Sequence, residues 1–445
     1  MKTFEINFDG IVGPTHNYSG LSFGNTASIK NSSKVSNPKK AALQGIKKMG
    51  LMHSLGIAQG VLPPQLRPDL YTLRKIGFTG TDLQVIYNAG LNEKKIYEAC
   101  CSASSMWSAN CATVSSSADT ADSKVHFTPA NLVSKLHRSI EPETTSAILK
   151  AVFNNKDYFT HHPPLPLCEY FSDEGAANHI RLCKKYENSG VSLFVYGKDM
   201  DKKISNSSVV FPARQSLQAS KAIARVHKLD YNRVVFIRQS QAAIDAGVFH
   251  NDVISLGNKN VFLFHEKAFE NNNLIIDKLR ELFKKDEFYF IEVLESKVSL
   301  KNAVLSYLFN SQLVLLENGK MLLIVPEECS KIKSVNDFIN ELVQKENPIS
   351  GFKTVDLKES MLNGGGPACL RLKVVLNQNE INAVNKNVLY SIKLESKLVN
   401  WIDHHYRDRL CNDDLKDPDL FSEGLAALDE LTQILKLGSV YKFQL

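Results

Sequence analysis

A short unit of two strand-like runs joined by a turn recurs along the chain, and each copy is followed by a helix-like segment. One copy begins at His250 and turns at residues 257–260, and a second begins at Asn310 and turns at Asn318-Gly319. An Asn-Gly dipeptide between apolar runs is a strong signal for a tight hairpin. A looser copy begins at Asn110 and turns at residues 122–124. These hairpin-plus-helix units predict an α/β fold, and they differ from the single-strand βαβ alternation of a dinucleotide-binding domain.

The local pattern also predicts individual elements. Apolar residues at helical spacing predict helices over residues 274–282 and 334–343, the second with Ser334 as its N-cap. Residues 172–179 are expected to begin another helix, residues 370–376 to form the last strand, and residues 423–437 to form a C-terminal helix. No linker rich in Pro, Gly and Ser divides the chain cleanly, so residues 1–445 are expected to form a single domain.

Composition and charge exclude several classes of protein. The 445 residues are 43% hydrophobic and 22% charged, as in globular proteins and unlike disordered chains. The formal net charge of +6 arises from dispersed basic residues, whereas a dedicated nucleic-acid binder gathers them in a patch. The first residues lack the apolar core of a signal peptide, and no apolar stretch reaches the length of a membrane span. Eight irregularly spaced cysteines do not form a disulfide framework. We therefore expect a cytoplasmic protein that binds neither nucleic acid nor membranes.

A glycine-rich turn is the most unusual local feature. Three glycines at residues 364–366 come shortly before Cys369 and the strand that follows it. Without Cβ atoms, such a turn lets backbone N–H groups approach a ligand closely. The Lys-Ser/Thr pair of a phosphate-binding loop is missing. The pattern is compatible with a nucleophilic cysteine at the mouth of the strand, and equally with a tight loop beside a buried core cysteine.

An acid and two histidines could serve such a nucleophile. His250 and Asp252 are expected to open a strand and to point to one face of it, with Cα atoms roughly 6.5–7 Å apart. The imidazole could then move protons and the carboxylate could hold a cation, although both residue types are common at solvated strand ends. Glu174 could orient His250 in a Cys–His–Glu set, or it could merely complement a helix dipole. His179 is an equally available imidazole.

Candidate anion-binding residues are His137, Arg138 and Arg214, since an arginine can bind a carboxylate through two charge-assisted hydrogen bonds. Each could also be an ordinary surface charge. The loop over residues 13–28 is rich in Gly, Ser, Thr and Asn, and it could present backbone donors to an anion or be an ordinary loop. The other histidine pairs, at residues 161–162 and 404–405, lack acidic or sulfur partners at metal spacing, so no metal site is expected.

Longer blocks of sequence, spread over the whole chain, read FDGIVGPTHNYSGLSFGN, SMWSANCATVSSSADTADSKVHFT, LHRS, DEGAANH, PARQ, GVFHNDV, YLFNSQL, NGGGPACLRLKV and LGSVYKFQ. They closely resemble the N-succinylarginine dihydrolases of the arginine succinyltransferase pathway, a family of the pentein superfamily of guanidine-modifying enzymes. The resemblance implies a pentein α/β-propeller, in which five hairpin-plus-helix modules surround a pseudo-fivefold axis.

The resemblance also implies roles for particular residues. Cys369 would be the nucleophile, His250 the proton shuttle and Glu174 the third catalytic residue. The substrate contacts would be Ser19, Gly20, Leu21, Ser22, Phe23, Gly24, Asn25, Thr26, Ala27, Ser28, Asn110, His137, Arg138, Arg214, Asp252 and Asn363. Related enzymes often hold the guanidinium between two acidic residues, whereas the Asn110 module carries an amide at the comparable position.

The activity implied is hydrolysis of N-succinyl-L-arginine to N-succinyl-L-ornithine, two ammonia and carbon dioxide, with no cofactor and with a homodimer as the assembly. The alternative is an arginine-deiminase-like or amidinotransferase-like enzyme acting on another guanidine compound.

Overall fold

Five three-stranded sheets form the frame of the computed structural model, which describes residues 2–32, 34–202, 209–283 and 288–445. In each sheet the middle strand pairs antiparallel with a first strand and parallel with a third. In the order first, middle and third, the strands are β15 (Arg371–Asn377), β1 (Thr3–Gly10) and β2 (Ala58–Leu62); β3 (Ala112–Ser115), β4 (Val125–Pro129) and β5 (Phe159–His161); β6 (His179–Leu182), β7 (Val191–Tyr196) and β8 (Val234–Arg238); β9 (Ser255–Asn258), β10 (Val261–His265) and β11 (Tyr289–Val293); β12 (Gln312–Leu315), β13 (Met321–Pro326) and β14 (Ile349–Val355).

A helical connection joins the middle strand to the third strand in every sheet, because a parallel pair requires a crossover. The crossover helices are α1 (Thr26–Lys30) and α2 (Pro38–Ser54), α6 (Leu136–Ser139) and α7 (Pro142–Val152), α8 (Leu217–Val226), α10 (Asn272–Phe283), and α12 (Glu328–Lys331) and α13 (Lys333–Gln344). Four hairpin-plus-helix modules, and a fifth with the same strand pairing whose first strand is β15, confirm the fold class that the sequence predicted.

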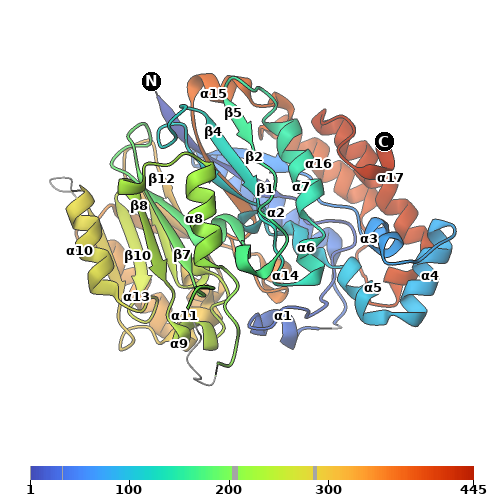
Figure 1. Ribbon diagram of the computed structural model, residues 1–445, viewed down its shortest axis with the longest axis horizontal. Helices are drawn as coiled ribbons and strands as arrows, with labels where there is room; N and C mark the ends of the chain where they lie inside the picture. The colour runs from blue at the N-terminus through green and yellow to red at the C-terminus, as the bar shows by residue number, and fades with distance from the viewer. Residues whose placement is uncertain (1, 33, 203–208, 284–287) are drawn as a thin grey trace.

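The remaining helices connect modules or cover the outside (Figure 1). They are α3 (Leu70–Lys75), α4 (Asp82–Asn92), α5 (Lys94–Cys100), α9 (Gln241–Asp245), α11 (Leu300–Ser306), α14 (Lys358–Leu362), α15 (Gln378–Ala383), α16 (Ile392–His405) and α17 (Pro418–Leu435). Helix α16 packs against both α2 and α17, so the C-terminal segment covers the first module (Figure 1).

The first module closes the ring, because its strands come from opposite ends of the chain. Strand β15 pairs antiparallel with β1, with Phe8 opposite Leu372 and Asp9 opposite Arg371. Alternate residues of a strand point to opposite faces. Phe8 and Leu372 therefore belong to the main apolar cluster, while Asp9 and Arg371 lie on the other face of the pair.

Short turns before the first strands bring polar residues to the centre. The 3-10 turns η2 (Ser108–Asn110), η4 (Gly175–Asn178), η6 (Asn251–Val253) and η7 (Leu308–Asn310) precede β3, β6, β9 and β12. An irregular turn at residues 367–370 precedes β15. Contacts link η2 to η4, η4 to η6, and η6 to η7. This succession places residues from distant parts of the sequence around one axis.

Three local predictions are wrong. Residues 172–179 do not begin an α-helix: η4 is followed at His179 by strand β6, because hairpin pairing with β7 overrides the local preference. His250 and Asp252 do not lie on a strand, since β9 begins only at Ser255 after η6. Ser334 is not the N-cap of α13; it lies inside the first turn, and its hydroxyl accepts a hydrogen bond from Asn302.

The other predicted elements are present with shifted ends. The hairpin after His250 turns between Asn258 and Val261, and the predicted helix over 274–282 is α10. The Asn318-Gly319 turn joins β12 to β13, with Gly319 at φ +81°. The last strand is β15, and the predicted C-terminal helix is the longer α17.

Candidate active site

One cavity gathers most of the residues that the sequence nominated. Its lining comes from the loop before α1, from η1 (Ala103–Met106) and η2, from α6, from the segments before α8 and η6, and from the glycine-rich turn. The nominated residues that line it are Ser19, Leu21, Ser22, Asn25, Ser28, Asn110, His137, Arg138, Arg214, His250, Asn363 and Cys369. Ser102, Ser104, Trp107, Phe249 and Gly364 also line it and were not nominated.

His250 and Glu174 form a buried pair. The His250 Nε2 atom lies 2.7 Å from Glu174 Oε2, and each side chain is 2% exposed. Burial alone would raise the pKa of Glu174, but the hydrogen bond with His250 and the positive charges of His250, Arg214 and Arg138 bring it to about 2. Burial lowers the pKa of His250, opposed by Glu174. Glu174 is therefore ionised and holds the imidazole of His250 in place.

His179 is not the partner of Glu174. It lines a separate cavity on the other side of η4 and η6, together with Asp252, Arg371 and Lys373. Its pKa is lowered to about 4 by burial. The structure therefore brings Glu174 together with His250 and leaves His179 outside the site.

Cys369 is buried, yet its thiol faces the cavity. The side chain belongs to a residue only 2% exposed, and its Sγ atom lies 3.5 Å from Asp252 Oδ2. Burial, together with the charge of Asp252, raises the pKa of the Cys369 thiol well above its usual range. In the absence of substrate the thiol is thus protonated, with Asp252 as its acceptor.

Asn310 contacts the sulfur of Cys369, although the sequence did not single out Asn310 as part of the site. Its Nδ2 atom donates to Cys369 Sγ at 3.0 Å, and its Oδ1 atom accepts from the backbone N–H groups of Gly366 and Cys369. The sequence signal was its position at the start of a repeated module, directly comparable to Asn110.

Glycine is required in this turn because the backbone lies too close to neighbouring side chains to leave room for a Cβ atom. A Cβ atom on Gly364, whose φ is +93°, would lie 2.0 Å from the side-chain oxygen of Asn25. A Cβ atom on Gly365 would lie 2.5 Å from the indole ring of Trp107. Both neighbours line the cavity. The glycines let the turn pack directly against the cavity wall.

A buried ion pair supports the same turn from behind. Lys48 Nζ on α2 lies 2.6 Å from Asp9 Oδ2, with side-chain exposures of 0% and 2%. The same ammonium donates to the carbonyl of Pro367 at 3.2 Å. Helix α2 therefore fixes the turn that carries Cys369.

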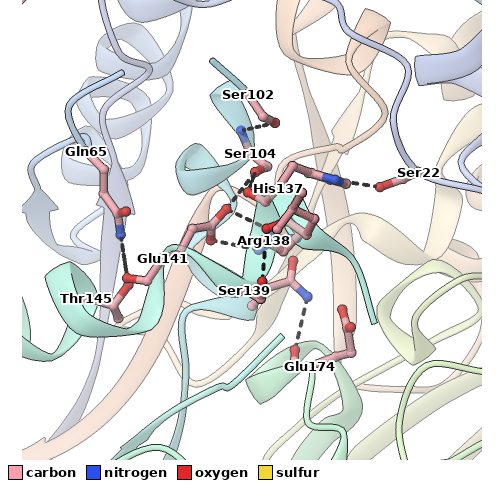
Figure 2. A network of polar contacts seen from close by, with 12 residues as sticks. Ser22, Gln65, Ser102, Ser104, His137, Arg138, Ser139, Glu141, Thr145 and Glu174 are labelled. Carbon is pink, nitrogen blue, oxygen red and sulfur yellow. Dashed lines mark hydrogen bonds and ion pairs between the residues drawn. The ribbon is translucent and has the colours of Figure 1, made fainter. Parts of the chain in front are cut away.

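Arg138 is buried and already paired. Its Nε and Nη2 atoms donate to the two carboxylate oxygens of Glu141, at 2.9 and 3.3 Å. Figure 2 shows Glu141 between Arg138 and Ser104, whose hydroxyl donates to the same carboxylate at 2.6 Å. Arg138 is therefore no ordinary surface charge, and its guanidinium is oriented before any ligand binds.

Arg214 is buried without such a partner. The residue is 7% exposed, its Nη2 atom donates to the carbonyl of Phe23 at 2.8 Å, and its guanidinium lies 5.0 Å from the ring centre of Phe249. Within the described residues, no carboxylate oxygen lies within 4.0 Å of it. Burial lowers its pKa, opposed by Glu174. An uncompensated buried cation is a strong indication of an anionic ligand.

His137 lines the cavity together with Arg138 and Arg214. Its Nε2 atom lies 3.2 Å from the hydroxyl of Ser22, as Figure 2 shows. Burial and the nearby charges of Arg138, Arg214 and Lys135 hold the pKa of His137 well below its usual range. We call His137, Arg138 and Arg214 the anion end. The reacting end consists of Cys369 and His250, which line the cavity, and of Glu174, Asp252 and Asn310, which contact these two from outside the lining.

The segment over residues 19–28 contributes alternately to the cavity and to its surroundings. Asn25 caps α1 and donates to the carbonyl of Gly364, while Ser28 donates to Asn363. Phe23 is 67% exposed and Thr26 is also exposed, so their side chains lie outside. The nominated residues of this segment that do not line the cavity are Gly20, Phe23, Gly24, Thr26 and Ala27.

Two further observations concern the chain as a whole. Among the described residues, no group of three His, Cys, Asp or Glu side chains is placed to hold a metal ion. No helix in the described ranges has both the length and the apolar character of a membrane span.

A family model described as succinylarginine dihydrolase matches residues 2–444. Proteins named N-succinylarginine dihydrolase from Pseudoalteromonas atlantica and Shewanella sediminis are 54% and 55% identical over 444 residues, with 100% of this chain and of each relative covered. Among solved structures, the product-bound N-terminal domain of ArgZ, a cyanobacterial arginine dihydrolase, is similar with a TM-score of 0.50 and 16% identity, covering 83% of this chain and 97% of that chain. The apo structure of ArgZ gives 0.50 and 15%, covering 83% and 40%. At this identity the solved structures bear on the fold alone.

Proposed function

The chain belongs to the succinylarginine dihydrolase family, and from this premise we propose that it hydrolyses N-succinyl-L-arginine to N-succinyl-L-ornithine, two ammonia and carbon dioxide. The observation that carries the proposal is the distribution of charge in one cavity. At the reacting end the Cys369 thiol lines the cavity, with Asp252 behind it at 3.5 Å; at the anion end lies Arg214, which has no carboxylate partner among the described residues. The substrate has the complementary arrangement, with a guanidinium at one end and two carboxylates at the other.

At the anion end, we assign the carboxylates of the substrate chiefly to Arg214. Its charge has no acidic partner within the described part of the chain, so a bound carboxylate supplies the compensation that burial requires. Arg138 offers the N–H groups that Glu141 does not occupy, and Ser22, Ser28, Asn25 and Asn363 add polar groups. Each charge-assisted hydrogen bond contributes roughly 1.5–3 kcal/mol.

At the reacting end, Asp252 accepts hydrogen bonds from the guanidinium. Once paired with that cation, Asp252 no longer opposes ionisation of Cys369, so the thiol proton passes to His250 and the thiolate forms where it is needed. The thiolate attacks the guanidinium carbon, and the C–N bond to a terminal nitrogen then breaks. His250, held by Glu174, gives a proton to the departing ammonia and takes one from the water that displaces sulfur. The first cycle leaves a ureido group.

A second cycle on the ureido carbon releases the second ammonia and leaves a carbamate of the product, which loses carbon dioxide. We assign Asn110 to this step, because it lines the cavity and its Nδ2 atom lies 3.0 Å from the carbonyl of Glu174 and 3.3 Å from His250 Nδ1. An amide suits a step in which the reacting group is neutral, whereas a second carboxylate would hold a cation. Thiolate, imidazole and water supply each of these steps.

The cavity has a volume of about 30 Å³, room for only a few water molecules. Substrate entry therefore requires the lining to move. We assign that movement to residues 19–28, whose contacts with the glycine-rich turn are the hydrogen bonds of Asn25 and Ser28.

Incubation of the purified protein with N-succinylarginine tests the proposal. We expect two ammonia for each N-succinylornithine, and Cys369→Ser should remove all turnover while leaving the thermal unfolding transition in place. One ammonia with accumulation of N-succinylcitrulline would make the protein a deiminase, and transfer to an amine without ammonia would make it an amidinotransferase.

The ionisation step has its own test. Alkylation of Cys369 by iodoacetamide should be slow in the free protein at pH 7.5 and should accelerate when a small guanidinium compound occupies the site next to Asp252. In Asp252→Asn the free protein should already react faster, because the carboxylate that favours the protonated thiol is gone. Equal rates in all three samples would contradict this role of Asp252.

We also propose that the chain acts as a single domain in a cytoplasmic homodimer. The pairing of β15 with β1 ties both ends of the chain into one module, and the eight cysteines, all of which lie in described segments, are free. Helix α4 exposes Leu83, Tyr87 and Leu91 at a spacing of four residues, which is an apolar face that a second copy could cover. Light scattering would give the mass in solution, and Tyr87→Lys should halve it if α4 forms the contact.

A further inference from the structure

Asn310 holds the nucleophile turn and the sulfur with opposite ends of one amide. The residue ends η7 and is fully buried. Its Oδ1 atom accepts from the N–H groups of Gly366 at 3.0 Å and Cys369 at 3.2 Å. Its Nδ2 atom donates to Cys369 Sγ at 3.0 Å and to the carbonyl of Asp252 at 3.3 Å. Its own carbonyl accepts from the N–H of Ala368 at 3.0 Å.

The two polar neighbours of the sulfur favour different protonation states. Asp252 Oδ2, at 3.5 Å, can only accept a hydrogen bond when ionised, so it favours the thiol. The Asn310 amide nitrogen can only donate, so it favours the thiolate. In a buried site, where the charged form of sulfur is costly, a fixed donor at hydrogen-bond distance offsets part of that cost.

We propose that Asn310 is a catalytic residue: its Nδ2–H group stabilises the Cys369 thiolate, while its Oδ1 atom keeps the turn in the orientation that makes this bond possible. The inference rests on the proposed nucleophile. It adds a donor to the sulfur that neither His250 nor Glu174 supplies.

A second asparagine shows that an amide can support a neighbouring turn without also contacting the sulfur. Asn178 ends η4 as Asn310 ends η7, and its Oδ1 atom accepts from the N–H of Asn251 in the next module at 2.9 Å. This is the same support of a neighbouring turn without a sulfur contact. An asparagine oxygen can thus support a neighbouring turn by itself, and Asn310 adds to it the 3.0 Å contact of its nitrogen with Sγ.

Two substitutions at this position test the inference. Asn310→Asp retains an acceptor for the two N–H groups and replaces the donor by a carboxylate oxygen, and Asn310→Ser removes the amide without adding charge. The rate of Cys369 alkylation by iodoacetamide is measured at fixed pH between 8 and 9.5, by mass spectrometry of the tryptic peptide over residues 359–371, which contains this cysteine and no other. Turnover of N-succinylarginine is measured in parallel.

We expect alkylation to fall at least tenfold in both variants, which corresponds to a rise of about one unit in the thiol pKa. The value of kcat/KM should fall by about 10²- to 10³-fold, as for loss of one donor to a developing negative charge. The matched control Asn178→Asp should change the alkylation rate by less than threefold. Thermal unfolding of each variant identifies samples that have lost their fold, and Asn310→Ser is the variant to interpret if Asn310→Asp does not fold.

Unchanged alkylation in a folded Asn310 variant would overturn the inference, even if turnover fell, because a purely structural residue would affect geometry and not thiol ionisation. The proposed function fails separately, through activity that persists in Cys369→Ser. An inactive Cys369→Ser together with Asn310 variants that react and turn over normally would retain the nucleophile and remove Asn310 from the mechanism.

Discussion

At the reacting end of the cavity the protein side chains bond one another, whereas at the anion end only one of the two arginines has a carboxylate partner among the described residues. Glu174 binds His250, and Asn310 and Asp252 both contact Cys369. At the other end, Glu141 occupies Arg138, but Arg214 donates only to the carbonyl of Phe23 among its side-chain contacts in the described chain. The catalytic side chains must be oriented before the substrate arrives. A side chain that binds the substrate must instead have a charge that only the substrate neutralises. The following variants test this difference.

Glu174→Gln should have the largest effect. The amide keeps the shape of the side chain but removes the charge that orients and supports His250, so kcat should fall by about 10³- to 10⁴-fold with little change in KM. Steady-state ammonia release gives both constants. Asp173→Asn is the control, because this neighbouring buried carboxyl group binds Gln215 and Gly175 rather than His250. A kcat within threefold of the parent would show that the mechanism does not require the charge of Glu174.

Glu141→Gln should mainly reduce stability. It leaves the buried Arg138 without its charge partner, and breaking a buried ion pair costs about 3–5 kcal/mol. Urea unfolding measures the loss. The double variant Arg138→Met/Glu141→Gln should recover much of it, since no unpaired charge remains. A double variant as unstable as the sum of the two single variants would show that the pair is not coupled.

Asp173→Asn should change how stability depends on pH. Burial raises the pKa of Asp173 from 3.8 to about 6, so the folded protein binds this proton more tightly than the unfolded chain does. The contribution of the protonated group is present below about pH 4 and is lost as pH rises through 6, by up to about 3 kcal/mol. The stability of the variant relative to the parent should therefore increase between pH 4 and 7. A constant difference over that range would contradict the raised pKa.

Arg214→Met should raise KM by about 10- to 100-fold, because a charge-assisted hydrogen bond to a carboxylate contributes roughly 1.5–3 kcal/mol. The decrease in kcat should be smaller. Arg138→Met should raise KM less, since Glu141 already occupies two of its N–H groups. An equal effect of the two substitutions would remove the distinction between the paired and the unpaired arginine.

Thr26→Ala should have the smallest effect, with KM within twofold of the parent. The side chain is exposed and does not line the cavity, although its neighbour Asn25 does. Asn25→Ala, which removes both the helix cap and the contact with Gly364, is the matched comparison. A large effect of Thr26→Ala would show that this part of the segment turns inward when substrate binds.

Local sequence determined the hairpins and the glycine-rich turn. The Asn318-Gly319 dipeptide and the alternation around residues 256–264 act through neighbouring residues, so a reader of the chain can place them. The turn at residues 364–366 is likewise visible, because only glycine tolerates such close approach to Asn25 and Trp107. Local pattern nominated Cys369, His250 and Glu174 but left alternatives open for each, and the resemblance to a known family then favoured these three.

Tertiary structure alone decided which imidazole pairs with Glu174, which arginine is left without a carboxylate, and that the amide of Asn310 reaches the sulfur. These relations join residues dozens or hundreds of positions apart, and each depends on how the five modules close around the axis through β15 and β1. Sequence spacing carries no such information, because hydrogen bonds and ion pairs depend on distances of a few ångströms that only the closed ring defines.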